Sequence, residues 1–385
     1  MPGAPATSKE KTLAWVGIGL WLLGCLFGLF FLSWMFLIAP LMSPHGGAII
    51  QAELFAALFA VPACVVYMTV PWIVDRFDPE PWWALAMAFL WGALAAAGFA
   101  GLINTIMGGI GTAVAGKGGG DFVGSVISAP LVEEAFKGMA VLGMFWFMRR
   151  EFDGLVDGMI YGVFSALGFA MTENVLYYSN AIAMGTVTGA GLGDFTFQFV
   201  MRGVLKPWGH PLYTAITGLG VGMARETTKT WVKWVAPIGA YFLAVFMHAM
   251  WNFTAVLSSW TGVPLFLLLL VMYFIVMLCF MGMVFWLVAR EGKTLRKNLE
   301  DEVLMGNMSA ADLNLICSPF GRLKARMSKG SKGHKLVMVG IRLGMAKWHA
   351  ARAMKGQKMT ISMDSIVPLR QELIAVQREL AQQGR

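Results

Sequence analysis

Two adjacent glutamates and a lysine stand inside an apolar stretch of this chain. The segment "APLVEEAFKG", residues 129–138, carries Glu133, Glu134 and Lys137. Lys137 follows the two glutamates by four and three residues, so on a helix it lies on their side and can pair with both carboxylates. Charged groups in apolar helices are costly, and in a membrane they usually mark a functional site.

Other ionisable residues are isolated in the same way. Glu173 is the only acidic or basic residue in the stretch 158–193, and His248 is the only one in 234–289. Asn252 lies four residues after His248, so the two side chains project from one face of a helix. These groups and the glutamate pair lie at similar distances from the ends of their apolar stretches, which predicts one shared polar cavity.

A cavity with clustered carboxylates and imidazoles favours hydrolysis. Neighbouring acids in a low dielectric do not all ionise easily, so one of them can take a proton from water near neutral pH. His248 and Asn252 can then donate hydrogen bonds to the oxyanion that forms when water adds to an amide. This chemistry predicts cleavage of a peptide bond within or beside a membrane. His210 is a further candidate for the same site.

The same residue types also bind divalent metals. Glu134, Glu173 and His248 are the candidate ligands of a zinc ion, since glutamate and histidine are common zinc ligands. The sequence has no HExxH pair. The preferred glutamate-based mechanism requires no cofactor, and zinc stays open as an alternative.

The elements that must position these residues are expected to span a membrane. Hydrophobic residues make up 57% of the 385 residues and charged residues 14%, which is too little polar surface for a soluble globule. Stretches of about twenty apolar residues predict an all-α polytopic bundle of about eight transmembrane helices. The expected spans are 12–39, 51–74, 82–107, 125–148, 155–183, 195–224, 235–258 and 264–289.

The sixth of these spans is interrupted. Its segment "FVMRGVLKPWGHPLY" contains Arg202, Lys206 and Pro207. We expect a short helix at the outer surface, followed by a crossing from about Trp208, and the topology of 195–210 stays open.

Positive charge sets the expected orientation. Of the thirty Lys and Arg residues, eighteen lie from Arg290 onward, and the predicted outer loops carry only Lys117. Because cytoplasmic segments are enriched in Lys and Arg, both termini are predicted to be cytoplasmic, in the plasma membrane. The predicted inner loops contain Arg76, Arg149, Arg150, Arg225, Lys229 and Lys233.

Three regions follow from this pattern. Residues 1–11 are a cytoplasmic N-terminus, 12–289 the transmembrane domain, and 290–385 a basic, helical cytoplasmic tail. The tail is expected to contact the anionic inner leaflet of the bilayer. It has no nucleic-acid recognition motif, so no nucleic-acid partner is expected despite the net charge of +8.

Small residues recur at helical spacing in two predicted spans. Gly154, Gly158 and Gly162 recur every four residues, and "GLGVG" occupies 218–222. Such faces let transmembrane helices approach closely, so both are predicted to be packing surfaces.

The motifs resemble those of the PrsW family of intramembrane proteases. In order, "EEAFK" at 133–137, "FAMTE" at 169–173, "HPLYTAITG" at 210–218 and "HAMWN" at 248–252 are similar to its EExxK, FxxxE, histidine-containing and HxxxN motifs. The resemblance runs from about residue 70 to 255. The related CAAX prenyl proteases and CPBP proteins carry EExxxR and FxxxH instead, so Lys137 and Glu173 favour PrsW.

The resemblance implies a membrane-anchored protein substrate, an anti-sigma factor in the founding case, cut on the extracytoplasmic side. It implies that Glu133 or Glu134 activates the water and that Glu173 is a second acid or a ligand. His248 would orient the water or stabilise the oxyanion, with His210 and Asn252 in support. Lys137 would keep the glutamate pair charged and aligned.

Two other classes of protein stay open. Intramembrane acids and histidines also serve transporters and proton-coupled proteins. However, the two halves of the chain show no inverted hydropathy repeat and no paired broken helices. The other class is a catalytically inactive membrane scaffold, which can be separated from an enzyme only by testing whether substitutions in the site abolish an activity.

Overall fold

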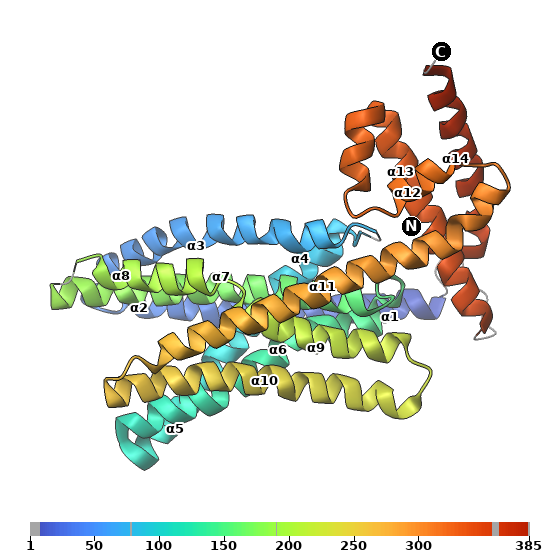
Figure 1. The fold of residues 1–385 in the computed structure, drawn as a ribbon. Coiled ribbons are helices and arrows are strands. Elements are labelled where there is room, and N and C mark those ends of the chain that lie inside the picture. The colour runs from blue at the N-terminus through green and yellow to red at the C-terminus, as the bar shows by residue number, and fades with distance from the viewer. Residues whose placement is uncertain (1–7, 78, 190, 356–361, 384–385) are drawn as a thin grey trace. The chain divides into compact units, whose positions relative to one another are not determined.

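A computed structural model describes residues 8–77, 79–189, 191–355 and 362–383. Within these ranges the chain forms helices and connecting turns and no β-strand (Figure 1). The predicted all-α class is therefore confirmed for the described residues. Most of the predicted cytoplasmic N-terminus, residues 1–7, lies outside them.

The chain divides into two compact units. The membrane unit comprises Ser8–Ile73 and Glu80–Phe280, and the tail unit comprises Val74–Pro79 and Met281–Arg385. The predicted boundary at 289/290 lies nine residues after the division at 280/281.

The membrane unit consists of long helices with short π-helical segments between some of them. Its elements are α1 (Ser8–Ser33), η1 (Trp34–Ile38), α2 (Ala39–Leu41), α3 (Gly46–Val74), α4 (Trp82–Leu90), η2 (Trp91–Ala96), α5 (Ala97–Asp121), η3 (Phe122–Ser128), α6 (Ala129–Phe147), η4 (Arg149–Glu151), α7 (Leu155–Thr188), α8 (Gly193–Gln198), η5 (Phe199–Leu205), α9 (Gly209–Glu226), α10 (Thr230–Thr261) and the first part of α11 (Leu265–Leu304).

Six described helical stretches are long and apolar enough to cross a membrane. One of them, Trp82–Phe147, contains the predicted third and fourth spans. Its helical geometry breaks at Ala115 and Gly116, where Gly116 has a φ of +69°, and the chain turns back there (Figure 1). The protein is thus a multi-pass membrane protein, and the count of eight spans stays a prediction.

The predicted interruption of the sixth span is present. The π-helical segment η5 ends at Leu205, and α9 begins at Gly209. Lys206 and Trp208 between them have non-helical backbone angles. Helix α9 is not among the six apolar stretches, because its sequence is more polar.

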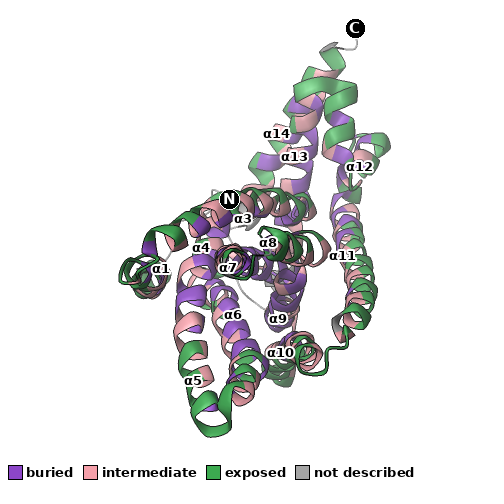
Figure 2. Ribbon diagram, turned by 90° about the vertical axis from the view of Figure 1, so that its left-hand side faces the viewer, coloured by how far each residue is buried: buried purple, intermediate pink, exposed green. Residues whose placement is uncertain are grey.

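Helix α7 lies at the centre of the membrane unit. It packs against α4, η2, α6, α8 and α9. Figure 2 shows α6, α7 and α9 largely buried, whereas α1 and α10 expose much of their surface. The exposed residues on the outer helices are mostly large and apolar, as expected for a lipid-facing surface.

Glycines bring α7 and α9 into direct backbone contact. A Cβ on Gly218 would lie 2.0 Å from the carbonyl oxygen of Gly158, and a Cβ on Gly158 would lie 2.2 Å from that of Gly218. Gly222 meets the carbonyl oxygen of Gly154 in the same way, at 2.5 Å. The two predicted small-residue faces are therefore confirmed, and they pack on each other. His210 lies two turns before Gly218 on α9, so this contact also sets its direction.

The tail unit has a hydrophobic core of its own. It is built from the end of α11 with α12 (Ala310–Ile316), α13 (Gly321–Lys355) and α14 (Ser362–Gln383). Glu302 is fully buried within it and accepts hydrogen bonds from Arg370 at 2.7 Å and Asn307 at 2.7 Å, beside Lys347. The predicted helical character is confirmed for the described part, whereas the core was not anticipated. Its buried members include Phe77, Leu295, Leu299, Leu313, Ile316, Leu336, Leu343, Leu373 and Val376.

Candidate active site

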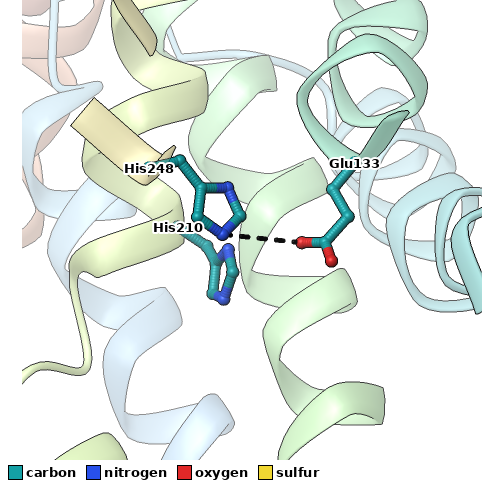
Figure 3. A group of neighbouring side chains, drawn as sticks. All are labelled: Glu133, His210 and His248. Carbon is teal, nitrogen blue, oxygen red and sulfur yellow. Dashed lines mark ion pairs between the residues drawn. The ribbon is translucent and has the colours of Figure 1, made fainter. Parts of the chain in front are cut away.

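Four helices bring the predicted acids and histidines into one cluster. Helix α6 contributes Glu133, Glu134 and Lys137, and each of α7, α9 and α10 contributes one residue. Those three residues are Glu173, His210 and His248. Figure 3 shows Glu133, His210 and His248 turned toward one another from three of these helices.

Glu134 is completely buried and completely hydrogen-bonded. Its Oε1 accepts hydrogen bonds from Lys137 Nζ at 2.6 Å and from His248 Nδ1 at 3.0 Å. Its Oε2 accepts a hydrogen bond from Thr214 Oγ1 at 2.9 Å. A buried carboxylate with this many donors is held rigidly, so Glu134 has the environment of a positioning group.

Glu133 is also buried but is much less engaged. Its Oε1 accepts a 3.3 Å hydrogen bond from Asn104, which in turn accepts a 2.7 Å bond from Ser128. Its Oε2 has no hydrogen-bond partner. The nearest cationic nitrogen is Lys137 Nζ, 3.8 Å away. An orphaned buried carboxylate oxygen is unfavourable unless it serves a ligand or a proton.

His248 faces this free oxygen. Because its Nδ1 carries the hydrogen donated to Glu134, its Nε2 presents a lone pair. That Nε2 lies 3.9 Å from Oε2 of Glu133 (Figure 3). The ring is held in this direction by stacking on Tyr213, at a centroid distance of 5.3 Å.

His210 is held between a cation and an acid. Its Nδ1 accepts a hydrogen bond from Lys137 Nζ at 3.0 Å, and its Nε2 donates to Glu173 at 2.8 Å. Glu173 also pairs with Arg202, whose Nε donates to Asn174 at 2.9 Å. Within the cluster, the side chains of Glu173 and Arg202 are the most exposed, at 15% and 23% of their surface.

Lys137 connects the two halves of the cluster. Its ammonium is fully buried, contacts both glutamates and His210, and lies 4.5 Å above the ring of Phe169. The predicted pairing of Lys137 with both carboxylates is confirmed. The removal of its charge would leave the acids without their nearest cation.

Asn252 does not share the bonds of the cluster. Its amide nitrogen donates to the carbonyl oxygen of Ser125 at 2.8 Å and so ties α10 to η3. No hydrogen bond joins it to the glutamates or histidines among the described residues. The sequence predicts that Asn252 projects from the same helix face as His248 and supports the site, and this supporting role stays a prediction.

Four residues that lie at or beside the cluster were not predicted from the sequence to belong to it. Arg202 and Lys206 were treated only as interruptions of a span, and Thr214 and Asn104 were not singled out. The basic pair Arg202 and Lys206 at the end of the apolar run 195–206 and the i, i+4 spacing of His210 and Thr214 were the available signals.

The donor atoms that could hold a metal differ from the predicted set. One donor atom each from Glu133, His210 and His248 lies within 4.8 Å of the others. Of the predicted ligands Glu134, Glu173 and His248, the two glutamates are already held by cations and hydroxyl or ring N–H donors. The orphaned Glu133 oxygen and the free His248 Nε2 fit a divalent metal, whereas His210 would have to release one of its present bonds.

The fold and the cluster define a multi-pass helical membrane protein with a buried glutamate–histidine centre. The family model described as PrsW family intramembrane metalloprotease matches residues 80–283, just over half of the chain. The chain belongs to this family.

Individual relatives agree with the family match. The chain is 32% identical over 161 residues to Protease PrsW of Halalkalibacterium halodurans, covering 42% of this chain and 62% of that protein. It is 29% identical over 181 residues to Protease PrsW of Bacillus subtilis, covering 46% of this chain and 70% of that protein. The first of these matches spans less than two thirds of the relative's length. No solved structure matches the chain significantly.

Proposed function

We propose that the protein is an intramembrane peptidase that hydrolyses a peptide bond of a membrane-anchored protein. The observation that carries this proposal is the pair of uncommitted acceptors in the cluster. Glu133 Oε2 and His248 Nε2 face each other at 3.9 Å inside the buried cluster. A water molecule between them would meet a base and an orienting imidazole at once.

The reaction follows from these positions. Glu133 accepts a proton from water while the water oxygen bonds to the carbonyl carbon, and the carbonyl electron pair moves onto its oxygen. The carbonyl then re-forms, the C–N bond breaks, and the proton held by Glu133 passes to the leaving amine. Glu134 fixes the tautomer of His248, as a carboxylate does for a catalytic or metal-binding histidine.

The donor set also supports a resident metal, in keeping with the description of the family. Glu133, His248 and His210 would hold a divalent ion such as zinc. When bound, such an ion lowers the pKa of water and polarises a carbonyl group.

The site is expected to act on the outer side of the plasma membrane, with both termini in the cytoplasm. This location rests on the charge distribution along the sequence. The substrate class is a membrane-anchored regulatory protein, of which an anti-sigma factor is one example. The tail unit, with its many Lys and Arg residues, is expected to contact the anionic inner leaflet.

The test compares the membrane proteomes of cells whose only copy of the protein is wild type or Glu133→Gln. Loss of a defined extracytoplasmic fragment in the variant, with accumulation of its full-length parent, supports the proposal and identifies a substrate. Glu300→Gln, at an exposed position in the tail unit, is the matched control and should keep every fragment. Unchanged fragments together with an altered ion or small-molecule gradient would favour the transporter class instead.

A further inference from the structure

Three basic side chains lie at or beside the cluster, and two of them are neutralised. Lys137 pairs with Glu134 and Glu133, and Arg202 pairs with Glu173. The third, Lys206, lies in the turn between η5 and α9. Within the described part of the chain, no hydrogen bond or ion pair involves its ammonium group.

Aromatic rings hold Lys206 in place. Its Nζ lies 3.6 Å from the ring centroid of Trp251 and 5.5 Å from that of Tyr213. Cation–π contacts of this kind fix an ammonium without using its N–H donors. Lys206 therefore offers N–H donors that no described group uses.

The rings that hold Lys206 belong to the same helices as the histidines. Trp251 follows His248 by three residues on α10, and Tyr213 follows His210 by three residues on α9. The Tyr213 ring also stacks on His248. Lys206 therefore packs against the same two helices that carry His210 and His248, and one of its ring neighbours also contacts His248.

A peptidase needs a donor for the oxygen that becomes negative in the reaction. His248 uses its Nδ1–H on Glu134, and Asn252 uses one of its two amide hydrogens on the carbonyl oxygen of Ser125. No described group uses the N–H donors of Lys206, so all of them are free for this step.

We propose that Lys206 binds the carbonyl oxygen of the scissile peptide and stabilises its negative charge. This inference rests on the proposed peptidase function and adds a catalytic residue to it. As the water oxygen bonds to the carbonyl carbon, the displaced electron pair settles on the oxygen that faces the ammonium. When the C–N bond breaks, the pair returns to the carbonyl, and Lys206 keeps its protons throughout.

The test measures kcat and KM for the full-length protein in liposomes. The probe is a library of fluorogenic peptides, each with an apolar spanning segment and a randomised juxtamembrane segment. Lys206→Met keeps a long apolar stem against Trp251 but removes the charge, so kcat should fall on the order of 100-fold or more while KM changes little. Lys206→Arg restores a permanent cation and should recover most of kcat.

The control is Lys233→Met, at an exposed position near the start of α10, which should match the wild type. An unchanged kcat in Lys206→Met would overturn the role of Lys206 while leaving the peptidase function intact. Equal losses in Lys206→Met and Lys206→Arg would also overturn it, because they would indicate a steric role. If the wild type cleaves no peptide of the library, both the inference and the proposed function fall.

Discussion

Glu133 and Glu134 are neighbours in sequence and both lie near Lys137 and His248, but their hydrogen bonds differ. Successive residues on a helix point about 100° apart, so only Glu134 comes within hydrogen-bond distance of both groups. Glu134 receives three hydrogen bonds, whereas Glu133 leaves one oxygen without any. This difference supports the proposal that Glu133 is the reactive acid and Glu134 the positioning one, which the sequence left as alternatives.

This separation predicts different outcomes for two isosteric changes. Glu134→Gln should abolish turnover and also destabilise the fold by about 3–5 kcal/mol, because Lys137 loses its closest counter-charge in a buried site. Glu133→Gln should abolish turnover with little change in stability. Thermal unfolding of the purified proteins, measured together with their activity, checks both expectations.

Metal content gives a second readout for the same variants. If zinc is resident, elemental analysis of the purified wild type should find it, and Glu133→Gln and His248→Ala should lose most of it. In the stability measurement, equal unfolding temperatures of Glu133→Gln and Glu134→Gln would contradict the roles proposed for the two glutamates. Equal zinc in the wild type and in His248→Ala would remove His248 from the ligand set.

The sequence predicted most of the charged centre but not the hydrogen bonds within it. The group Glu133, Glu134 and Lys137 stands out because it is the only charge in an apolar stretch, and Glu173 and His248 stand out in the same way. The pairing of Arg202 with Glu173 joins η5 to α7 and depends on how these elements pack. The bond from Asn252 to a backbone carbonyl of η3 depends on packing in the same way.

At the scale of elements, the crossing of α7 and α9 places Glu173 beside His210. The two helices touch at Gly158 and Gly218, where each Cα faces a carbonyl oxygen of the other. Close contact of this kind compensates for the absence of a hydrophobic driving force between helices in lipid.

A methyl group at this crossing should push the helices apart. Gly218→Ala would place a Cβ 2.0 Å from the carbonyl oxygen of Gly158, so it should lower both thermal stability and turnover strongly. Gly239→Ala on α10 is the control, because nothing lies within 4 Å of the added Cβ. A Gly218→Ala protein as stable and active as Gly239→Ala would contradict the packing described here.

Hydropathy predicted where most helices lie but not how each is built. The reversal at Ala115 and Gly116 lies inside the outer loop predicted between the third and fourth spans, beside Lys117. The π-helical segments η2, η3 and η5 arise from local hydrogen-bond shifts that have no sequence period of their own.

Over the whole chain, the composition and the charge pattern predict the membrane location and its orientation, and the structure adds a division into two units. Hydrophobic composition was enough to predict a multi-pass membrane protein. The core of the tail unit was missed because α13 and α14 are rich in charge, and their apolar positions are buried by each other, by α12, by Phe77 and by the end of α11.

The predicted orientation can be measured with single cysteines. Lys117→Cys should react with a membrane-impermeant maleimide added to intact cells, and Lys233→Cys should react only after the membrane is opened. Both positions are exposed in the structure. A Cys279→Ser background removes the one native cysteine classed as exposed. Labelling of Lys233→Cys in intact cells would reverse the orientation and place the site on the other side.

The proposed function depends on Glu133 activating water for peptide hydrolysis inside the membrane. To test this role, the wild type and Glu133→Gln are incubated in liposomes with a peptide that the wild type cleaves, in water enriched in ¹⁸O, and the product masses are measured by mass spectrometry. The wild type should yield a fragment with ¹⁸O in its new carboxyl terminus, and a folded Glu133→Gln protein should yield no fragment. A fragment formed by Glu133→Gln at the wild-type rate, or a wild-type fragment without ¹⁸O, would show that Glu133 does not activate water.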